Sequence, residues 1–134
     1  MDSTSRGLIE AYLQKADQKL AVSRRLLASS DYDDSISRAY YAAFHAVRAL
    51  LVTVGQNPTT HYGAITLFNL HFIKTGKLAQ EIGRFFTNLR DDRESADYEL
   101  FGNADASLAE KAVVEAARLV AAAREYLRGE ILID

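Results

Sequence analysis

The chain contains no cysteine and a single proline among its 134 residues. Without cysteine it can form neither a disulfide framework nor a zinc site built on thiolates, and a reducing compartment is compatible with this composition. No apolar run approaches the roughly 18 residues that a membrane-spanning helix needs, and the first residues, Met1 to Arg6, are polar. We therefore expect a cytoplasmic protein that makes no use of a membrane.

A strong charge of either sign is also missing, since 16 basic and 18 acidic residues give a formal net charge of −2. Proteins that bind nucleic acid over a broad surface are usually basic overall. The balance argues against such a surface and leaves room for a local basic pocket. Because 49% of the residues are hydrophobic, a chain of this length can bury a real core. We expect one domain over 1–134, with its core in about 8–128.

Several catalytic motifs are absent. The sequence has no His-Glu-x-x-His, no glycine-rich phosphate loop, no Gly-x-Ser-x-Gly and no Glu followed by His three residues later. These patterns accompany metalloproteases, nucleotide-binding folds, serine hydrolases and di-iron bundles. The three histidines, His45, His61 and His71, lack the spacing of metal ligands. We expect no metal site and no cofactor.

Hydrophobic residues recur with helical rather than strand spacing along the chain. The predicted helices cover about residues 9–30, 31–54, 60–75, 78–89 and 107–127. Asp31 is the predicted N-cap of the second helix, and Thr59 or Thr60 that of the third. Ser107 is predicted to cap the last helix in a capping box with Glu110. Short connections favour an all-α fold, an up-down antiparallel four-helix bundle with an additional short helix.

The predicted second helix is the most informative segment. One apolar stripe follows its length, alanines cover most of its back, and the remaining polar side chains fall within one sector of about 100°. Those side chains are Ser37, Arg38, His45 and Arg48. A mostly buried helix with two arginines and a histidine on one edge needs either internal carboxylates or an anionic ligand or partner. For His45 alone, a hydrogen-bonded core histidine is the competing interpretation.

A long charged stretch separates the fourth predicted helix from the last, between Leu89 and Ser107. It exceeds the few residues that connections in bundles usually need, and long connections often carry function. The alternative is a solvated, partly helical linker whose opposite charges pair with each other.

Three pieces of the sequence resemble the HEPN family (higher eukaryotes and prokaryotes nucleotide-binding), in particular its small stand-alone prokaryotic members. They are the tyrosine-rich helix from Ser37 to Ala46, His61-Tyr62-Gly63, and Arg93 with Ala96-Asp97-Tyr98. The similarity covers about 8–127. It implies a helical bundle that is usually dimeric, so a homodimer is expected. It also implies one of two activities. Many members are metal-independent endoribonucleases, and others act beside a minimal nucleotidyltransferase, often as a toxin–antitoxin-like pair, or bind nucleotides.

The nuclease motif of this family is an Arg, four to six intervening residues, and a His. Carried over, the motif places Arg93 at the Arg position and Tyr98 at the His position, and no His follows Arg93 at any spacing. A phenol with a pKa near ~10 is a poor base at neutral pH, where an imidazole titrates. Arg38 and His45 match the spacing, but they lie on another predicted helix, and we regard that match as coincidental.

Three hypotheses remain. The leading one is a non-catalytic or weakly catalytic module that binds a nucleotide or RNA phosphate in a basic pocket, with a nucleotidyltransferase-like protein or a second copy as partner. Its predicted ligand-binding residues are Arg38, His45, Arg48, Arg93 and Asp97. The alternative is a metal-independent endoribonuclease with Arg93 and Tyr98 as catalytic residues. In the third, the charges are structural, and Arg38 or Arg48 pairs with Asp97 or another carboxylate.

Overall fold

The computed structural model describes residues 1–98 and 104–131, and of Tyr98 and Ile131 it describes the backbone alone. Every regular element within these ranges is a helix. The elements are α1 (Ser3–Ala28), α2 (Tyr32–Val52), α3 (His61–Phe68), the π-helix η1 (Asn69–Ile73), α4 (Gln80–Tyr98) and α5 (Ala106–Ile131). In the described ranges, no helix combines the length and the apolar character that crossing a bilayer demands.

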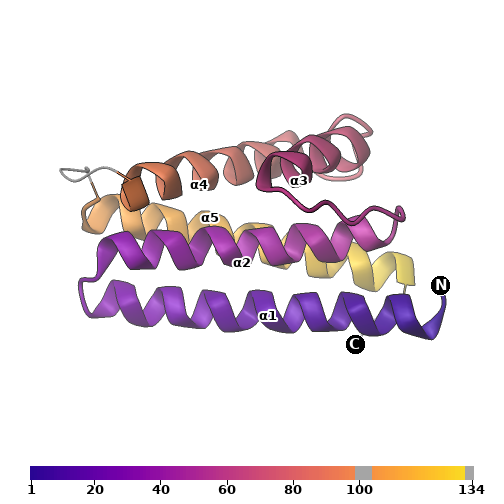
Figure 1. The fold of residues 1–134 in the computed structure, drawn as a ribbon, viewed down its shortest axis with the longest axis horizontal. Coiled ribbons are helices and arrows are strands. Elements are labelled where there is room, and N and C mark those ends of the chain that lie inside the picture. Colours follow the sequence, from indigo (N-terminus) through magenta and orange to yellow (C-terminus); the bar gives the residue numbers. More distant parts are fainter. Residues whose placement is uncertain (99–103, 132–134) are drawn as a thin grey trace.

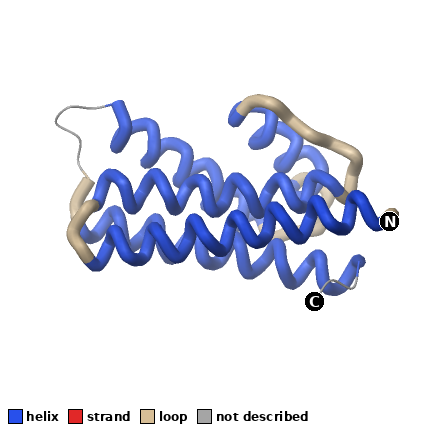
Figure 2. Tube along the Cα trace, turned by 60° about the horizontal axis from the view of Figure 1, so that its bottom comes forward, coloured by secondary structure: helices blue, strands red, loops and turns tan. Residues whose placement is uncertain are grey.

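The four long helices run alternately up and down and form a bundle (Figure 1). Helix α2 packs against α1, α4 and α5, and the short α3 and η1 lie at the end of the bundle where α1 begins (Figure 2). The predicted four-helix bundle with an additional short helix is therefore confirmed.

The core forms around the apolar stripe of α2. The largest side chains of α2 that are fully buried are Tyr40, Val47, Leu50, Leu51 and Ile36. The alanines on its back are buried too and let the neighbouring helices approach closely. Two buried serines link α2 to α1. Ser23 Oγ donates to the Ser35 carbonyl oxygen over 2.7 Å, and Ser35 Oγ donates to the Ser23 carbonyl oxygen over 2.8 Å. This reciprocal pair satisfies both buried hydroxyls.

The predicted cap positions are confirmed for two helices and wrong for one. Thr60 caps α3, since its Oγ1 accepts a hydrogen bond from the Gly63 amide over 2.9 Å. Asp31 stands before α2 as predicted, but its carboxylate accepts from Ser29 Oγ over 2.6 Å and makes no capping bond.

The predicted cap of the last helix is wrong. Asp105 Oδ1 accepts from the Leu108 amide over 2.9 Å, so α5 starts at Ala106 and Ser107 lies within its first turn. The physical reason is that an aspartate caps at least as well as a serine and also places negative charge at the positive end of the helix dipole.

Helix α4 continues to Tyr98, well beyond the predicted end at Leu89. The added segment contains neither Gly nor Pro, and Arg93 and Asp97 form an i,i+4 ion pair along it, which favours helix. The charged stretch that the sequence assigned to a connection is thus helical as far as Tyr98. Its arginines are held at fixed positions on a helix, and this placement defines the site described next.

Candidate functional site

Arg93 lies on the face of α4 that packs against α2. Its guanidinium carbon is 5.1 Å from the ring centroid of Tyr40 and 5.7 Å from that of Tyr41. One nitrogen, Nη1, donates to the Tyr41 hydroxyl over 3.4 Å and to Asp97 Oδ2 over 3.3 Å. The side chain is 11% exposed, and its buried Nε has no hydrogen-bond partner within the described ranges. The two tyrosine rings and Asp97 therefore fix the guanidinium and leave part of its donor set unused.

Arg38 reaches the same tyrosine from α2. Its guanidinium carbon is 5.2 Å from the Tyr41 centroid, so two guanidinium groups approach one ring. In the part of the chain that the structure describes, Arg38 forms no ion pair with a carboxylate. The structure thus brings together three of the five residues predicted to bind the ligand: Arg38, Arg93 and Asp97.

The other two predicted residues lie further along α2, against α1. The Arg48 guanidinium carbon is 4.7 Å from the Tyr12 centroid, and its Nη2 donates to Asn57 Oδ1 over 3.0 Å. His45 stacks on the same Tyr12 ring at 6.5 Å. Burial, aided by the nearby charge of Arg48, lowers the pKa of His45 to about 4. His45 is therefore a neutral ring near neutral pH rather than a cation.

Phe44 connects these two groups. Its ring centroid is 4.7 Å from that of His61, 6.3 Å from that of Tyr41, and 5.7 Å from the Arg48 guanidinium carbon. Phe44 is itself buried, so it joins the two groups beneath the surface, and cations alternate with aromatic rings along this side of α2. We call this arrangement the cation–aromatic strip and define it as Tyr12, Arg38, Tyr41, Phe44, His45, Arg48, His61 and Arg93.

Sequence reasoning missed His61 as a member of this site. The residue opens α3, and its Nδ1 lies 2.8 Å from the hydroxyl of Tyr40. Burial, together with the charge of Arg93, lowers the pKa of His61. The contact joins residues that are distant in sequence and depends on how α3 folds back onto α2. The resemblance marked His61-Tyr62-Gly63 as a familiar segment, but it gave His61 no place in the site.

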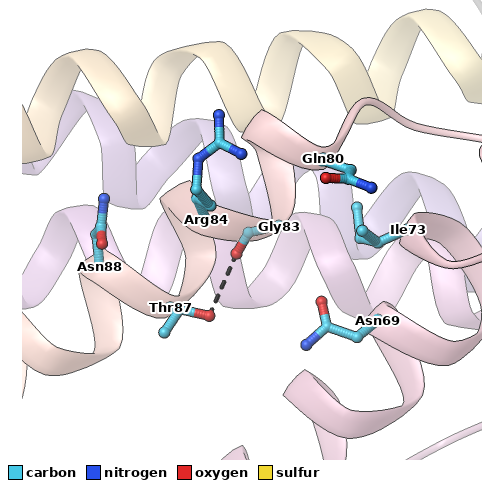
Figure 3. A pocket seen from close by; sticks show the side chains of 7 residues that line it. All are labelled: Asn69, Ile73, Gln80, Gly83, Arg84, Thr87 and Asn88. Atoms are coloured by element: carbon cyan, nitrogen blue, oxygen red, sulfur yellow. Dashed lines mark hydrogen bonds between the residues drawn. The ribbon is translucent and has the colours of Figure 1, made fainter.

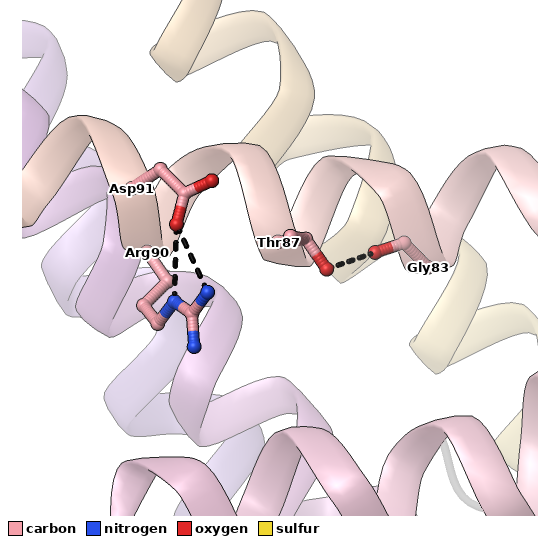
Figure 4. Close-up of polar contacts among 4 residues, drawn as sticks. All are labelled: Gly83, Thr87, Arg90 and Asp91. Atoms are coloured by element: carbon pink, nitrogen blue, oxygen red, sulfur yellow. Dashed lines mark hydrogen bonds and ion pairs between the residues drawn. The ribbon is translucent and has the colours of Figure 1, made fainter.

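Arg90 was missed for a different reason. It precedes Arg93 by three positions and so shares a face with it once the stretch is known to be helical. Figure 4 shows that Arg90 is already engaged, because its Nε and Nη2 donate to Asp91 Oδ1 over 3.2 and 3.0 Å. A helix predicted through this stretch would have identified it.

Two predictions about the charged stretch have separate outcomes. Tyr98 ends α4, and its side chain lies outside the described residues, so its catalytic role stays a prediction. The structural hypothesis that Asp97 pairs with Arg38 or Arg48 is corrected, because Asp97 pairs with Arg93 on its own helix. An i,i+4 pair forms within one turn and does not tie α4 to α2.

A hollow of about 420 Å³ lies elsewhere, between η1 and α4 (Figure 3). It is lined by Asn69, Ile73, Gln80, Gly83, Arg84, Thr87 and Asn88. Gly83 makes the close packing possible, since a Cβ there would lie 3.0 Å from Ile73 Cγ1. Arg84 is the single charged residue of the lining, and no aromatic ring contributes. We therefore take the strip, which combines several cations with aromatic rings, as the candidate site.

Comparison with known proteins places the chain among characterised folds. A family model described as HEPN domain matches residues 9–126. Two proteins of Methanocaldococcus jannaschii, each described as a "Putative toxin", are 38% identical over 90 residues and 37% identical over 91 residues. The two matches cover 67% and 68% of this chain but only 67% and 62% of the relatives. The crystal structure of TT1696 from Thermus thermophilus has the same fold, with a TM-score of 0.75 and 18% identity over 89% of this chain and 98% of that one.

Proposed function

The chain belongs to the HEPN domain family, and from that premise we propose that it binds a nucleotide or RNA phosphate along the cation–aromatic strip. The observation that carries the proposal is the pair of guanidinium groups at Tyr41. Arg38 has no carboxylate partner in the described ranges, and the buried Nε of Arg93 has no acceptor there. Guanidinium groups bind phosphate through several hydrogen bonds at once, and a phosphate would provide the missing acceptors.

The aromatic members give the strip a second means of binding. Tyr12 and Tyr41 are partly exposed, and bases of single-stranded RNA stack on such rings without regard to sequence. Arg48 lies at the Tyr12 end of the strip, where it would contact a neighbouring phosphate. A binding surface of this kind is compatible with a net charge of −2 because the cations act locally.

The wider biological setting is also part of the proposal. We place the chain in a toxin–antitoxin-like module, as a homodimer acting with a minimal nucleotidyltransferase-like protein. Two relatives are each described as a "Putative toxin", and resemblance to small stand-alone HEPN proteins suggests the partner. Co-expression with the product of the adjacent gene, followed by affinity purification and size-exclusion chromatography, tests this. The pair should elute as one complex, and separate elution would contradict the setting without affecting phosphate binding.

The binding test uses a fluorescein-labelled single-stranded RNA of roughly ten nucleotides and ATP as a second probe. Fluorescence anisotropy should show that Arg93→Ala and Arg38→Ala each weaken RNA binding by about tenfold, the cost of losing a charge-assisted hydrogen bond. The matched control is Arg128→Ala, which removes an exposed arginine from the last turn of α5 and should leave affinity unchanged. A wild type that binds neither RNA nor ATP would overturn the proposal.

A metal-independent endoribonuclease is the second candidate function. One observation favours it, namely that an imidazole, His61, lies beside Arg93 although no His follows Arg93 in sequence. Incubating RNA with the protein in EDTA tests the activity, with Arg93→Ala and Tyr98→Phe as variants. Cleavage that disappears in Arg93→Ala would make this function the better one, and intact RNA would exclude it.

A further inference from the structure

His61 occupies a special position at the Arg93 end of the strip. Its ring centroid is 5.5 Å from that of Tyr40 and 5.8 Å from that of Tyr41, the same two rings that hold the Arg93 guanidinium. His61 is partly exposed, whereas Tyr40 beneath it is fully buried. The imidazole therefore forms part of the surface next to Arg93, and its orientation is set from below.

The hydrogen bond from Tyr40 fixes which nitrogen of His61 carries the proton. Burial raises the pKa of Tyr40, so its hydroxyl stays protonated. Within residues 1–98 and 104–131, the partner of that hydroxyl is His61 Nδ1, at 2.8 Å. A buried hydroxyl donates its proton to an available acceptor, so Nδ1 accepts. In the neutral imidazole the proton then resides on Nε2.

We propose that His61 is a further phosphate-contacting residue of the site, beside the two arginines, presenting a fixed Nε2–H donor to an oxygen of the phosphate that Arg93 binds. The inference rests on the proposed phosphate binding and adds to it a residue with a defined chemical role. Arg93 supplies charge, and His61 supplies a neutral donor whose direction Tyr40 sets. Burial, together with the charge of Arg93, lowers the pKa of His61 and so favours the neutral ring.

The fixed proton has a consequence for the choice between binding and cleavage. A general base for RNA cleavage must accept the proton of a ribose 2′-hydroxyl. In His61, Nδ1 is occupied by the Tyr40 hydroxyl and Nε2 already carries a proton, so neither nitrogen has a free lone pair. Held in this way, the neutral ring of His61 donates a hydrogen bond from Nε2 and offers no free lone pair to the 2′-hydroxyl proton. The geometry therefore favours phosphate binding over cleavage by an imidazole base.

The test measures binding of the labelled RNA by His61 variants of the full chain. We expect His61→Ala to bind about tenfold more weakly. His61→Gln, whose amide can donate from the Nε2 position, should stay within about threefold of the wild type by the same reasoning. The matched control is His71→Ala, which removes a histidine from η1, outside the strip. Thermal unfolding of each variant shows that it is folded at the binding temperature.

A second measurement reads the tautomer directly. Long-range ¹H–¹⁵N correlation NMR at neutral pH should show the His61 proton on Nε2 in the wild type and a mixture of tautomers in Tyr40→Phe. A proton on Nδ1 in the wild type would overturn the inference, as would equal weakening in His61→Ala and His61→Gln. If Arg93→Ala loses binding while His61→Ala binds normally, His61 has no role and the proposed function stands. If the wild type binds no RNA and no ATP, both proposals fail.

Discussion

Mild acid should destabilise this fold, because the bundle holds His45 in its neutral form. The pKa of His45 is about 4 in the folded chain, against about 6.5 for an unperturbed histidine. Between these two values the unfolded chain binds more protons than the folded one, so stability falls as the pH falls from about 6.5 towards about 4. Below about pH 4 the folded ring is protonated too, so His45 no longer makes the free energy of unfolding depend on pH.

The size of the effect follows from the shift and from the exposure of the ring. A shift of this size corresponds to roughly 3 kcal/mol at full effect. Because His45 is only partly buried, solvent screening reduces our expectation to about 1–2 kcal/mol lost between about pH 7 and about pH 5. The neighbours that disfavour the charged ring, after burial itself, are Arg48, Lys15 and Lys19.

Urea unfolding followed by circular dichroism, at about pH 7 and about pH 5, measures this loss. The comparison protein is His45→Gln, whose side chain at this position cannot titrate. Between about pH 7 and about pH 5 its free energy of unfolding should fall by about 1–2 kcal/mol less than that of the wild type. His61, whose pKa is also lowered, and Asp92, whose pKa burial raises, contribute to both proteins alike. Equal losses in the wild type and the variant would refute the reasoning.

Three further predictions concern stability and are measured by the same unfolding assay. Gly83→Ala should destabilise by about 1 kcal/mol, because overpacking against η1 outweighs the gain in helix propensity. Gly129→Ala, whose added Cβ meets nothing within 4 Å, should stabilise by up to about 1 kcal/mol. Equal changes in the free energy of unfolding for Gly83→Ala and Gly129→Ala would contradict tight packing between Gly83 and η1. Asp105→Ala should lower the free energy of unfolding by about 1 kcal/mol because α5 loses its cap, while Ser107→Ala should change it by no more than about 0.5 kcal/mol. A larger loss in Ser107→Ala than in Asp105→Ala would mean that Ser107 caps the helix after all. Asp97→Ala should lower the free energy of unfolding by about 0.5 kcal/mol, the usual contribution of an i,i+4 ion pair. A loss of about 3 kcal/mol or more would mean that Asp97 belongs to a buried structural ion pair.

The sequence predicts the bundle well because its signals are local and repetitive. The predicted stripe runs through Tyr40, Phe44, Val47, Leu51 and Val54. The first four side chains are buried, and Val54, just beyond the end of α2, is partly buried. Thr60 marks the start of α3 by a cap that acts over three residues. Signals of this kind depend on the backbone geometry of one helix, and they can be read without knowing the neighbours.

The features that the sequence misses depend on a choice between two similar residues or on contacts between helices. The stretch after Leu89 is so charged that it suggests a solvated connection, yet it keeps Arg93 on the face that meets α2, and packing decides in favour of helix. Asp105 and Ser107 are both good caps, and the capping-box pattern with Glu110 drew the prediction to Ser107 although the charge of Asp105 suits the helix dipole better. His61 joins the site only because α3 folds back onto Tyr40.

The most direct test of the account is a double-mutant cycle on the two guanidinium groups that approach Tyr41. Affinities for the labelled RNA are measured for the wild type, Arg38→Ala, Arg93→Ala and the double variant. If both arginines hold one phosphate, each single variant loses about tenfold, and the loss in the double variant departs clearly from the product of the single losses. Single variants that bind RNA as tightly as the wild type would contradict a phosphate site at Tyr41.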